Sequence, residues 1–363
     1  MKVAIDARWN YHGGVGVYVS NLITALPEVA AAHGVEIVAY QDSRRPICHQ
    51  HPNLSVVPFD FGCYSPRSQY ELSRQLRHDG VNLFHTPFYL APFFAPCPVL
   101  ITIHDLIPFF FPVYGRLHTE LVKVAYRASA RRATHIVAAS DATRRDVIQV
   151  LRVTPDRITQ IYSSLRHDIF HPDSAPGEAK HLRERYGIER PYVLVLSASN
   201  WQTKNLAAAL EAIEAARGRC SIEFQTVVAG SPIGLDFSGW RHRLRNTIVT
   251  GAVPFEDLPK LYRCAAVFLS LSKYEGFGFP LAEAMACGTA CIASTGGSLP
   301  EIAGEGAVIL PASDVNGIAH MIVELLTDRD RRNEMSSKAQ LRASQFTSIR
   351  FAENLLGLYK RII

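Results

Sequence analysis

Residues 273–288, KYEGFGFPLAEAMACG, carry the strongest structural signal in the chain. Two carboxylates, Glu275 and Glu283, stand eight positions apart, with two glycines, two phenylalanines and a proline between them. The apolar run AVFLSLS at 266–272 comes directly before and has the length and composition of a buried strand. FPLAEAMA then has the composition of a helix, with Pro280 suited to its first position. The stretch therefore predicts a strand, a glycine-rich loop and a helix in succession.

That order of elements suits a ligand that contains phosphate. Gly276 and Gly278 let the backbone turn sharply, which brings amide N–H groups close to a ligand. The start of the helix adds unpaired amides and a partial positive charge. Glu275 stays in the loop and Glu283 falls near the first helical turn, so the two carboxylates can bind hydroxyls at different ends of one extended ligand. A glycine-rich connection with one helix-stabilising glutamate is the alternative for this stretch alone.

Short apolar runs alternate with helical segments in both halves of the 363-residue chain. Such runs of four to seven residues between helices indicate buried parallel strands with right-handed crossovers. The strands expected in the first half are residues 3–6, 36–40, 82–86, 99–105 and 135–140, with helices at 17–32, 67–79, 118–132 and 141–151. Those expected in the second half are residues 192–197, 224–230, 246–251, 266–272, 290–294 and 307–311.

This alternation predicts an α/β protein with two Rossmann-like, doubly wound domains. Residues 169–180, rich in proline, glycine and polar residues, are the expected linker. The domains would then be residues 1–170 and 171–349, facing a central cleft. Ligands of such sheets bind at the carboxyl ends of the strands.

Composition narrows the function classes. No apolar run is expected to reach the roughly 18 residues that cross a bilayer, and MKVAID begins a strand and not a signal peptide. The seven cysteines include no CxxC pair and are expected to be reduced thiols of a cytoplasmic protein. The net charge of +5 lacks the basic density of a nucleic-acid-binding protein. Residues 1–170 hold 17 basic and 13 acidic residues, which suits either a solvated surface or an anionic partner such as lipid.

EGFGFPLAE followed by AMACG resembles the signature of the family 4 retaining glycosyltransferases, which have the two-domain GT-B fold. The resemblance covers nearly the whole chain, because further segments occur in the family's order. These are residues 13–26 (GGVGVYVSNLITAL), 99–108 (VLITIHDLIP), 135–148 (HIVAASDATRRDVI), 203–206 (TKNL), 250–288 and 296–304 (GGSLPEIAG). HDLIP and GGSLPE are similar to segments of bacterial mannosyltransferases that build surface polysaccharides.

The resemblance implies roles for residues of the second half. Glu275 would hold hydroxyls of the transferred sugar, and Glu283 would bind the ribose. Lys204, in SNWQTKNL, would meet the diphosphate, which a lysine just past the end of a strand can reach and neutralise. Many relatives carry an arginine where this chain has Thr203, so a second cation for the diphosphate is unassigned. The donor-binding loop would comprise Gly276, Phe277, Gly278 and Phe279.

In the first half, His104 ends the apolar run 99–105 and is expected to donate a hydrogen bond to a sugar hydroxyl or to the transition state. The resemblance gives Gly14 and Gly16 a place beside the diphosphate and the acceptor. A dinucleotide fingerprint is the rival interpretation of GGVGVY. It lacks its third glycine, since Val19 stands there, although Asp42 follows the second strand as that fingerprint requires.

No metal or cofactor is expected. DRD at 328–330 matches the D-x-D motif of the other glycosyltransferase fold, but it lacks a preceding strand and favours a solvated turn. The chain has no histidine and cysteine spacing suited to zinc. Catalysis would instead concentrate on the leaving diphosphate, stabilised by Lys204, the loop amides and the helix start. The resemblance implies retention of configuration without a protein nucleophile.

Donor and acceptor are expectations from the same resemblance. GDP-mannose is the first choice of donor and a UDP-sugar the second, and the acceptor would be a glycan or a lipid-linked glycan. The aromatic stretches 87–94 and 107–115, with Lys123, Arg127 and Arg131, suit peripheral contact at the inner membrane face or ordinary core packing. A non-catalytic sugar-nucleotide binder and a sugar-nucleotide phosphorylase or epimerase are the other classes considered.

The helical pattern at the end of the chain is the last feature. Residues 345–363 carry apolar side chains at 351, 355, 356, 359 and 362, a period near 3.6. The family resemblance implies that residues 350–363 of this helix return to pack on the N-terminal domain.

Overall fold

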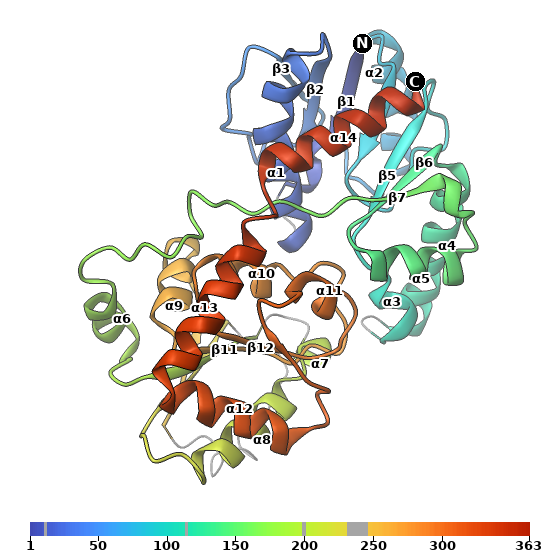
Figure 1. Ribbon diagram of the computed structural model, residues 1–363. Helices are drawn as coiled ribbons and strands as arrows, with labels where there is room; N and C mark the ends of the chain where they lie inside the picture. The colour runs from blue at the N-terminus through green and yellow to red at the C-terminus, as the bar shows by residue number, and fades with distance from the viewer. Residues whose placement is uncertain (11–12, 113–114, 198–200, 231–245) are drawn as a thin grey trace. The chain divides into compact units, whose positions relative to one another are not determined.

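The computed structural model describes residues 1–10, 13–112, 115–197, 201–230 and 246–363, which form two compact units (Figure 1). The first unit joins Met1–Ser164 to Phe346–Ile363, and the second is Leu165–Gln345. These boundaries lie within six residues of those expected from the sequence, 170/171 and 349/350. Parts of the expected segments SNWQTKNL and 107–115 fall outside the described residues.

The first unit contains a parallel sheet of seven strands in the order β3-β2-β1-β4-β5-β6-β7. Its strands are β1 (Lys2–Asp6), β2 (Glu36–Gln41), β3 (Leu54–Pro58), β4 (Leu83–Thr86), β5 (Val99–Ile103), β6 (His135–Ala138) and β7 (Ile158–Gln160). The two edge strands, β3 and β7, were not expected. β3 alternates between half-buried and exposed residues and β7 has only three residues, so neither has the apolar run of a central strand.

Helices cover this sheet and supply its two apolar cores. They are α1 (Gly13–Ala31), α2 (Pro66–His78), α3 (Ile107–Phe110), α4 (Arg116–Arg132), α5 (Asp141–Leu151) and α14 (Ser348–Ile362). α1 is long and apolar enough to cross a membrane, so the expectation that no such run exists is wrong. More than half of that run is buried, and its side chains Tyr18, Leu22 and Leu26 lie in the core, which identifies α1 as a core helix.

The last helix, α14, completes the core of the first unit against α1. Phe351, Leu355 and Tyr359 are almost fully buried there. The hydroxyl of Tyr359 lies 2.7 Å from Nδ1 of His85, a fully buried side chain of β4. Nε2 of His85 lies 2.8 Å from Oγ1 of Thr102 in β5, so one chain of polar contacts ties α14 to two central strands.

The second unit has a parallel sheet of six strands in the order β10-β9-β8-β11-β12-β13. Its strands are β8 (Tyr192–Leu196), β9 (Gln225–Ala229), β10 (Thr247–Gly251), β11 (Val267–Ser270), β12 (Cys291–Ala293) and β13 (Val308–Ile309). Its helices are α6 (Glu178–Tyr186), α7 (Trp201–Lys204), α8 (Leu206–Arg217), α9 (Leu258–Cys264), α10 (Phe279–Ala286), α11 (Leu299–Ala303), α12 (Val315–Thr327) and α13 (Arg329–Ala343).

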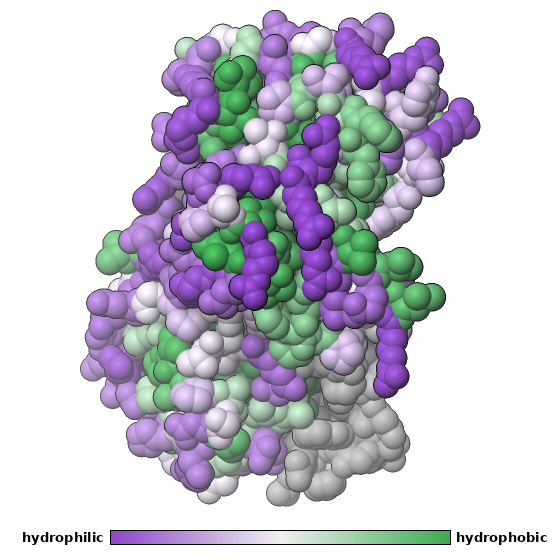
Figure 2. Space-filling model, turned by 90° about the vertical axis from the view of Figure 1, so that its right-hand side faces the viewer, coloured by the Kyte–Doolittle hydropathy of each residue, from purple (hydrophilic) through white to green (hydrophobic). Residues whose placement is uncertain are grey.

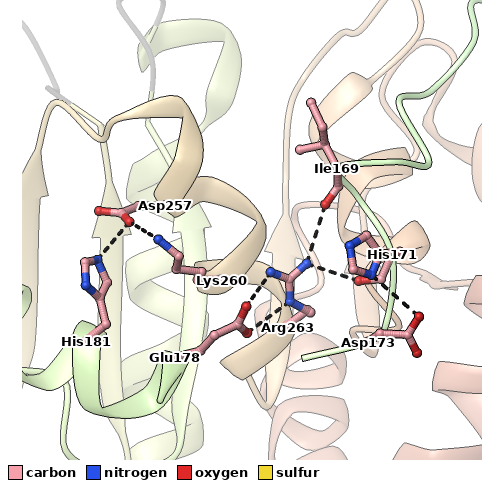
Figure 3. A network of polar contacts seen from close by, with 8 residues as sticks. All are labelled: Ile169, His171, Asp173, Glu178, His181, Asp257, Lys260 and Arg263. Atoms are coloured by element: carbon pink, nitrogen blue, oxygen red, sulfur yellow. Dashed lines mark hydrogen bonds and ion pairs between the residues drawn. The ribbon is translucent and has the colours of Figure 1, made fainter. Parts of the chain in front are cut away.

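The linker expected at 169–180 is held against α9 by ionic contacts (Figure 3). Arg263 of α9 pairs with Glu178 of α6 and donates to the backbone carbonyls of Ile169 and His171. Removal of either buried ion would leave the other uncompensated, which is strongly destabilising. The start of the second unit is therefore fastened to α9 by charge as well as by apolar packing.

Strand order reverses once in each sheet, between β1 and β4 and between β8 and β11. Ligands of doubly wound sheets bind at the carboxyl ends of the strands beside such a switch point. The expected fold class, two Rossmann-like parallel-sheet units, is confirmed. In the second unit, the loop that carries Glu275 and the short helix that carries Lys204 both leave strands of the switch point.

We expect Tyr359→Phe to lower the free energy of unfolding by about 1–3 kcal/mol, because a buried ring nitrogen of His85 loses its partner. Denaturant unfolding followed by tryptophan fluorescence and circular dichroism measures the change. Tyr70→Phe, at a tyrosine that is 67% exposed, is the control and should shift stability by less than about 0.5 kcal/mol. Equal effects of the two substitutions would show that the His85 contact does not stabilise the unit.

Candidate active site

The loop between β11 and α10 is shaped by Gly278. This residue precedes α10 with φ of +87°, a conformation that side chains rarely adopt. A β-carbon there would lie 3.0 Å from Cδ2 of Leu299. Within the described part of the chain, the backbone amides of Gly278 and Phe279 at the start of α10 have no hydrogen-bond acceptor. Such amides are suited to bind an anion.

Gly296 and Gly297, which follow β12, pack closely against the backbone of this loop. A β-carbon on Gly297 would lie 2.4 Å from the carbonyl oxygen of Glu275, and one on Gly296 would lie 2.1 Å from that of Ser272. The amide of Ser298 donates to the Glu275 carbonyl at 3.0 Å. The segment GGS after β12 therefore fixes the backbone of Glu275. The family resemblance includes this segment but implies no role for it.

Lys204 and Glu275 form a direct ion pair, with Nζ 2.6 Å from Oε1. Their side chains are only 19% and 15% exposed, so the surrounding protein screens the pair less than water would. The amide of Lys273 donates to the carbonyl of Thr203 at 2.7 Å, which joins the backbone beside Lys204 to the loop of Glu275. The sequence assigned these two ions to different parts of a ligand, and the structure brings them together.

Glu283 lies in α10 and is 6% exposed. The hydroxyl of Tyr262 in α9 donates to its Oε2 at 3.1 Å. Burial raises the pKa of Glu283 to about 7, while the Tyr262 hydrogen bond and the charge of Lys204 lower it. Glu283 therefore titrates near neutral pH, and its pKa is lowered by the charge of Lys204, the same lysine that pairs with Glu275. Sequence reasoning did not find Tyr262, because nothing in its spacing from Glu283 indicates the contact.

The two phenylalanines of the loop pack on each other, with ring centroids 5.0 Å apart. Phe277 is buried and Phe279, the first residue of α10, is partly buried. Their side chains hold the loop, so a ligand contact at these positions would use backbone atoms. Gly276 is buried beside them.

His104 follows β5 in the first unit, and its ring makes one hydrogen bond to a carbonyl. Nε2 lies 2.9 Å from the carbonyl oxygen of Pro87, and a carbonyl only accepts, so Nε2 carries the proton. Burial lowers the pKa of His104 to about 4, so the ring is neutral at pH 7 and Nδ1 is an acceptor. The expected donor role would require Nε2 to leave Pro87.

Tyr18 supports this ring from α1, with centroids 4.8 Å apart in an edge-on arrangement. The Tyr18 hydroxyl lies 3.2 Å from Oγ1 of Thr102, which also contacts His85. The series of polar contacts that begins at Tyr359 of α14 therefore ends at Tyr18, whose ring packs against His104. The signal for His85 was present in the sequence as a histidine inside the apolar run 82–86, but it was not interpreted.

Gly14 and Gly16 lie at the start of α1, the first exposed and the second buried. Asp42, the acid that kept the dinucleotide hypothesis open, is already bound by Arg44 through Nε at 2.8 Å and Nη2 at 2.6 Å. This pairing lowers the pKa of Asp42 to about 2. A ribose would have to displace an arginine from the carboxylate, which argues against that hypothesis.

The DRD segment forms a helix start. Oδ1 of Asp328 accepts from the amide of Arg331 at 2.9 Å and so caps α13, and Asp330 lies in the first turn. Within the described ranges, no group of three or more histidine, cysteine or acidic side chains could hold a metal ion.

Two family descriptions match the chain. "Glycosyltransferase Family 4" matches residues 12–168, and "Glycosyl transferases group 1" matches residues 179–342. O-antigen chain mannosyltransferase B of Escherichia coli is 26% identical over 291 residues, which cover 77% of this chain and 74% of that protein. The serotype-specific mannosyltransferase WbdA of Escherichia coli is 26% identical over 278 residues, or 74% of this chain, which spans only 34% of that longer protein.

Solved structures show the same architecture. Sucrose-phosphate synthase from Thermosynechococcus elongatus superposes with a TM-score of 0.75 at 20% identity, over 100% of this chain and 99% of the other. HepE from Anabaena, in complex with UDP-glucose, gives a TM-score of 0.77 at 16% identity, over 99% and 100%. At these identities the likeness shows the fold, which is GT-B. With both halves matched by their family descriptions, the chain belongs to the family 4 glycosyltransferases and resembles bacterial mannosyltransferases.

Proposed function

We propose that this protein transfers a hexose, with mannose favoured, from a nucleotide-diphosphate sugar to a glycan or lipid-linked glycan, with retention of configuration. The ion pair of Lys204 and Glu275, at the switch point of the second sheet and beside the start of α10, carries the proposal. A cation, a carboxylate that can accept hydrogen bonds from hydroxyls, and helix amides thus lie where doubly wound sheets bind ligands, which supports the proposal. The mannosyltransferases among the relatives favour mannose.

The chemistry follows from charge. Negative charge grows on the diphosphate as the glycosidic bond breaks, and Lys204 with the amides of Gly278 and Phe279 stabilises that charge. The diphosphate competes with Glu275 for Lys204 and so frees the carboxylate to accept hydrogen bonds from the sugar. Glu283 accepts the ribose hydroxyls, and the departing phosphate takes the proton of the acceptor hydroxyl. In the first unit, Nδ1 of neutral His104 is available to accept a hydrogen bond from a hydroxyl.

We favour GDP-mannose as donor and keep a UDP-sugar as the second choice, since HepE was solved with UDP-glucose. A nucleotide-sugar donor places the reaction in the cytoplasm, and a lipid-linked acceptor would place it at the inner membrane face. We propose no metal and no cofactor, because Lys204 and the start of α10 supply the positive charge that a metal would bring to the diphosphate.

A donor screen tests the function directly. Incubation of the purified chain with octyl α-mannoside and GDP-mannose, UDP-glucose or UDP-galactose should give transfer from GDP-mannose, measured as an α-linked product by mass spectrometry and NMR. The rate should be unchanged in excess EDTA. Loss of turnover that manganese restores would overturn the metal-free proposal. Donor binding without product for any donor and acceptor would favour a non-catalytic sugar-nucleotide binder.

Glu283→Gln should weaken donor binding by about 1–3 kcal/mol, or roughly five- to 150-fold, because a charged acceptor of ribose hydroxyls is lost while the side chain keeps its shape. Calorimetric titration with the donor selected by the screen measures the affinity. Glu211→Gln, at an exposed position of α8, is the matched control. Unchanged affinity in Glu283→Gln would remove the ribose assignment.

A further inference from the structure

The solvent-facing side of α4 is apolar along its centre. Leu117, Leu121 and Val124 are 78%, 62% and 58% exposed. Their spacing of four and three residues places them on one face of the helix. The buried residues of α4 lie on the opposite face and are Thr119, Tyr126, Ser129 and Ala130. A helix on the surface of a soluble protein normally carries polar side chains where α4 carries this stripe.

Positive charge surrounds the stripe. α4 contains five arginines and lysines and one acidic residue, Glu120. Arg127, Arg131 and Arg132 follow the stripe along the helix and are exposed. Lys123, in contrast, is only 21% exposed and pairs with Glu120 at 2.8 Å, so it contributes less than the sequence suggested.

Exposed aromatic residues extend the apolar area on both sides of α4. Phe110 of α3 is 46% exposed, and Phe109 beside it lies under the guanidinium of Arg127. Phe93 and Phe94 are 53% and 70% exposed and line a shallow pocket together with Ala125 and Ser129 of α4. Figure 2 looks onto the side of the molecule that carries α4 in Figure 1 and shows apolar side chains among hydrophilic ones.

We define the α4 surface as Leu117, Leu121 and Val124, the phenylalanines 93, 94 and 110, and the arginines 127, 131 and 132. We propose that the α4 surface docks this protein onto a bilayer that contains anionic phospholipid. The apolar stripe would enter the region between headgroups and acyl chains, while the arginines bind lipid phosphates. Exposed apolar residues beside a net positive charge, with Glu120 the single acid of α4, match an anionic bilayer better than a neutral protein surface.

Docking on a bilayer would bring the protein to lipid-linked acceptors, but it does not require the proposed reaction to take place. α3 and α4 follow β5 directly, and β5 ends beside His104. A bilayer held against α4 would therefore supply lipid-linked acceptors to the unit that contains His104. Vesicle binding needs neither donor nor turnover, so its failure is separable from failure of the proposed function.

The purified full chain should sediment with vesicles of phosphatidylglycerol and phosphatidylcholine, and with vesicles of phosphatidylcholine alone much more weakly. Replacement of Leu117, Leu121 and Val124 by serine should lower vesicle binding at least about tenfold, because the exposed stripe no longer inserts. Arg127→Gln with Arg131→Gln should also lower it, and should reduce its dependence on salt concentration.

Matched controls are present elsewhere on the molecule. Leu341→Ser with Ile349→Ser removes two leucine or isoleucine side chains of similar exposure, 71% and 62%, outside the α4 surface. Lys180→Gln with Arg183→Gln removes two exposed charges on α6. Equal binding by the stripe variant and its control would overturn the proposal. So would concentration-dependent dimerisation that the stripe variant abolishes, since a second copy would then be the occupant.

A separate observation concerns Tyr262, the fully buried side chain that donates to Glu283. Its ring packs edge-on against Phe268 at 5.4 Å, and its carbonyl accepts from Oγ1 of Thr289 at 2.7 Å. The neighbouring Arg263 holds the linker, as Figure 3 shows. One turn of α9 is thus fixed on both sides, and the Tyr262 hydroxyl has a defined position.

Among the described residues, two polar groups from other elements influence Glu283, one through a hydrogen bond and one through its charge. They are the Tyr262 hydroxyl from α9 and the ammonium of Lys204 from α7. Cys287, which caps the end of α10, and Cys291 in β12 lie near the tyrosine, and burial keeps the pKa of both thiols above the ordinary value, so they stay neutral. The hydrogen bond and the lysine therefore oppose the effect of burial on the Glu283 carboxyl group.

We infer that Tyr262 is a positioning residue for the donor, because its hydroxyl holds Oε2 of Glu283 and leaves Oε1 for the ribose. This inference rests on the proposed function. Because burial raises the pKa of Glu283 to about 7, affinity for nucleoside diphosphate should rise with pH through neutrality. Loss of the Tyr262 hydroxyl removes an influence that lowers this pKa, so the rise should move to higher pH.

Calorimetric titration of Tyr262→Phe with GDP and with UDP, from pH 6 to pH 9, tests this shift. We expect weaker binding at pH 7, recovery toward pH 9, and a midpoint about one pH unit above that of the unmodified protein. Tyr192→Phe removes another buried tyrosine hydroxyl, bonded to the carbonyl of Leu261, and should leave the midpoint unchanged. An unshifted midpoint in Tyr262→Phe would overturn the inference. Full affinity in Glu283→Gln would instead show that the ribose assignment has failed.

Discussion

The ion pair between Lys204 and Glu275 joins the two segments that leave the switch-point strands of the second sheet. Three backbone contacts keep it in place: the amide of Lys273 on Thr203, and the close approach of Gly296 and Gly297 to the Glu275 loop. A larger residue at either glycine would push the loop away. The position of the pair therefore depends on three separate stretches of chain. The pKa of Glu283 depends in turn on the pair, because the charge of Lys204 lowers it.

Much of this arrangement could be predicted because it is local in sequence. The residue types in EGFGFPLAE are enough to predict a loop, a glycine before a helix, and an acid on each side of that glycine. The central strands could be predicted because they are apolar runs. What could not be predicted joins residues that are distant in the chain, such as Tyr262 with Glu283 or Tyr359 with His85. The edge strands β3 and β7 were not predicted, because a partly solvated or very short strand needs no apolar run.

The protonation states of the site residues also could not be predicted from the sequence. A glutamate in a helix is ordinarily ionised at neutral pH, and only burial raises the pKa of Glu283 to about 7. His104 shows the same limit, since the carbonyl of Pro87 decides which ring nitrogen carries the proton. On α4, the sequence drew attention to Lys123, Arg127 and Arg131, but it did not indicate that Leu117, Leu121 and Val124 face solvent.

The return of α14 to the first unit means that this unit can complete its core only after the second unit has been synthesised. The second unit is one continuous segment, residues 165–345, and can close its core as soon as it leaves the ribosome. The first unit is begun earlier but lacks Phe351, Leu355 and Tyr359 until residues 346–363 have been made. Domains generally fold in the order of their synthesis. Here the N-terminal sheet would wait, with part of its apolar face uncovered, while the C-terminal unit folds first.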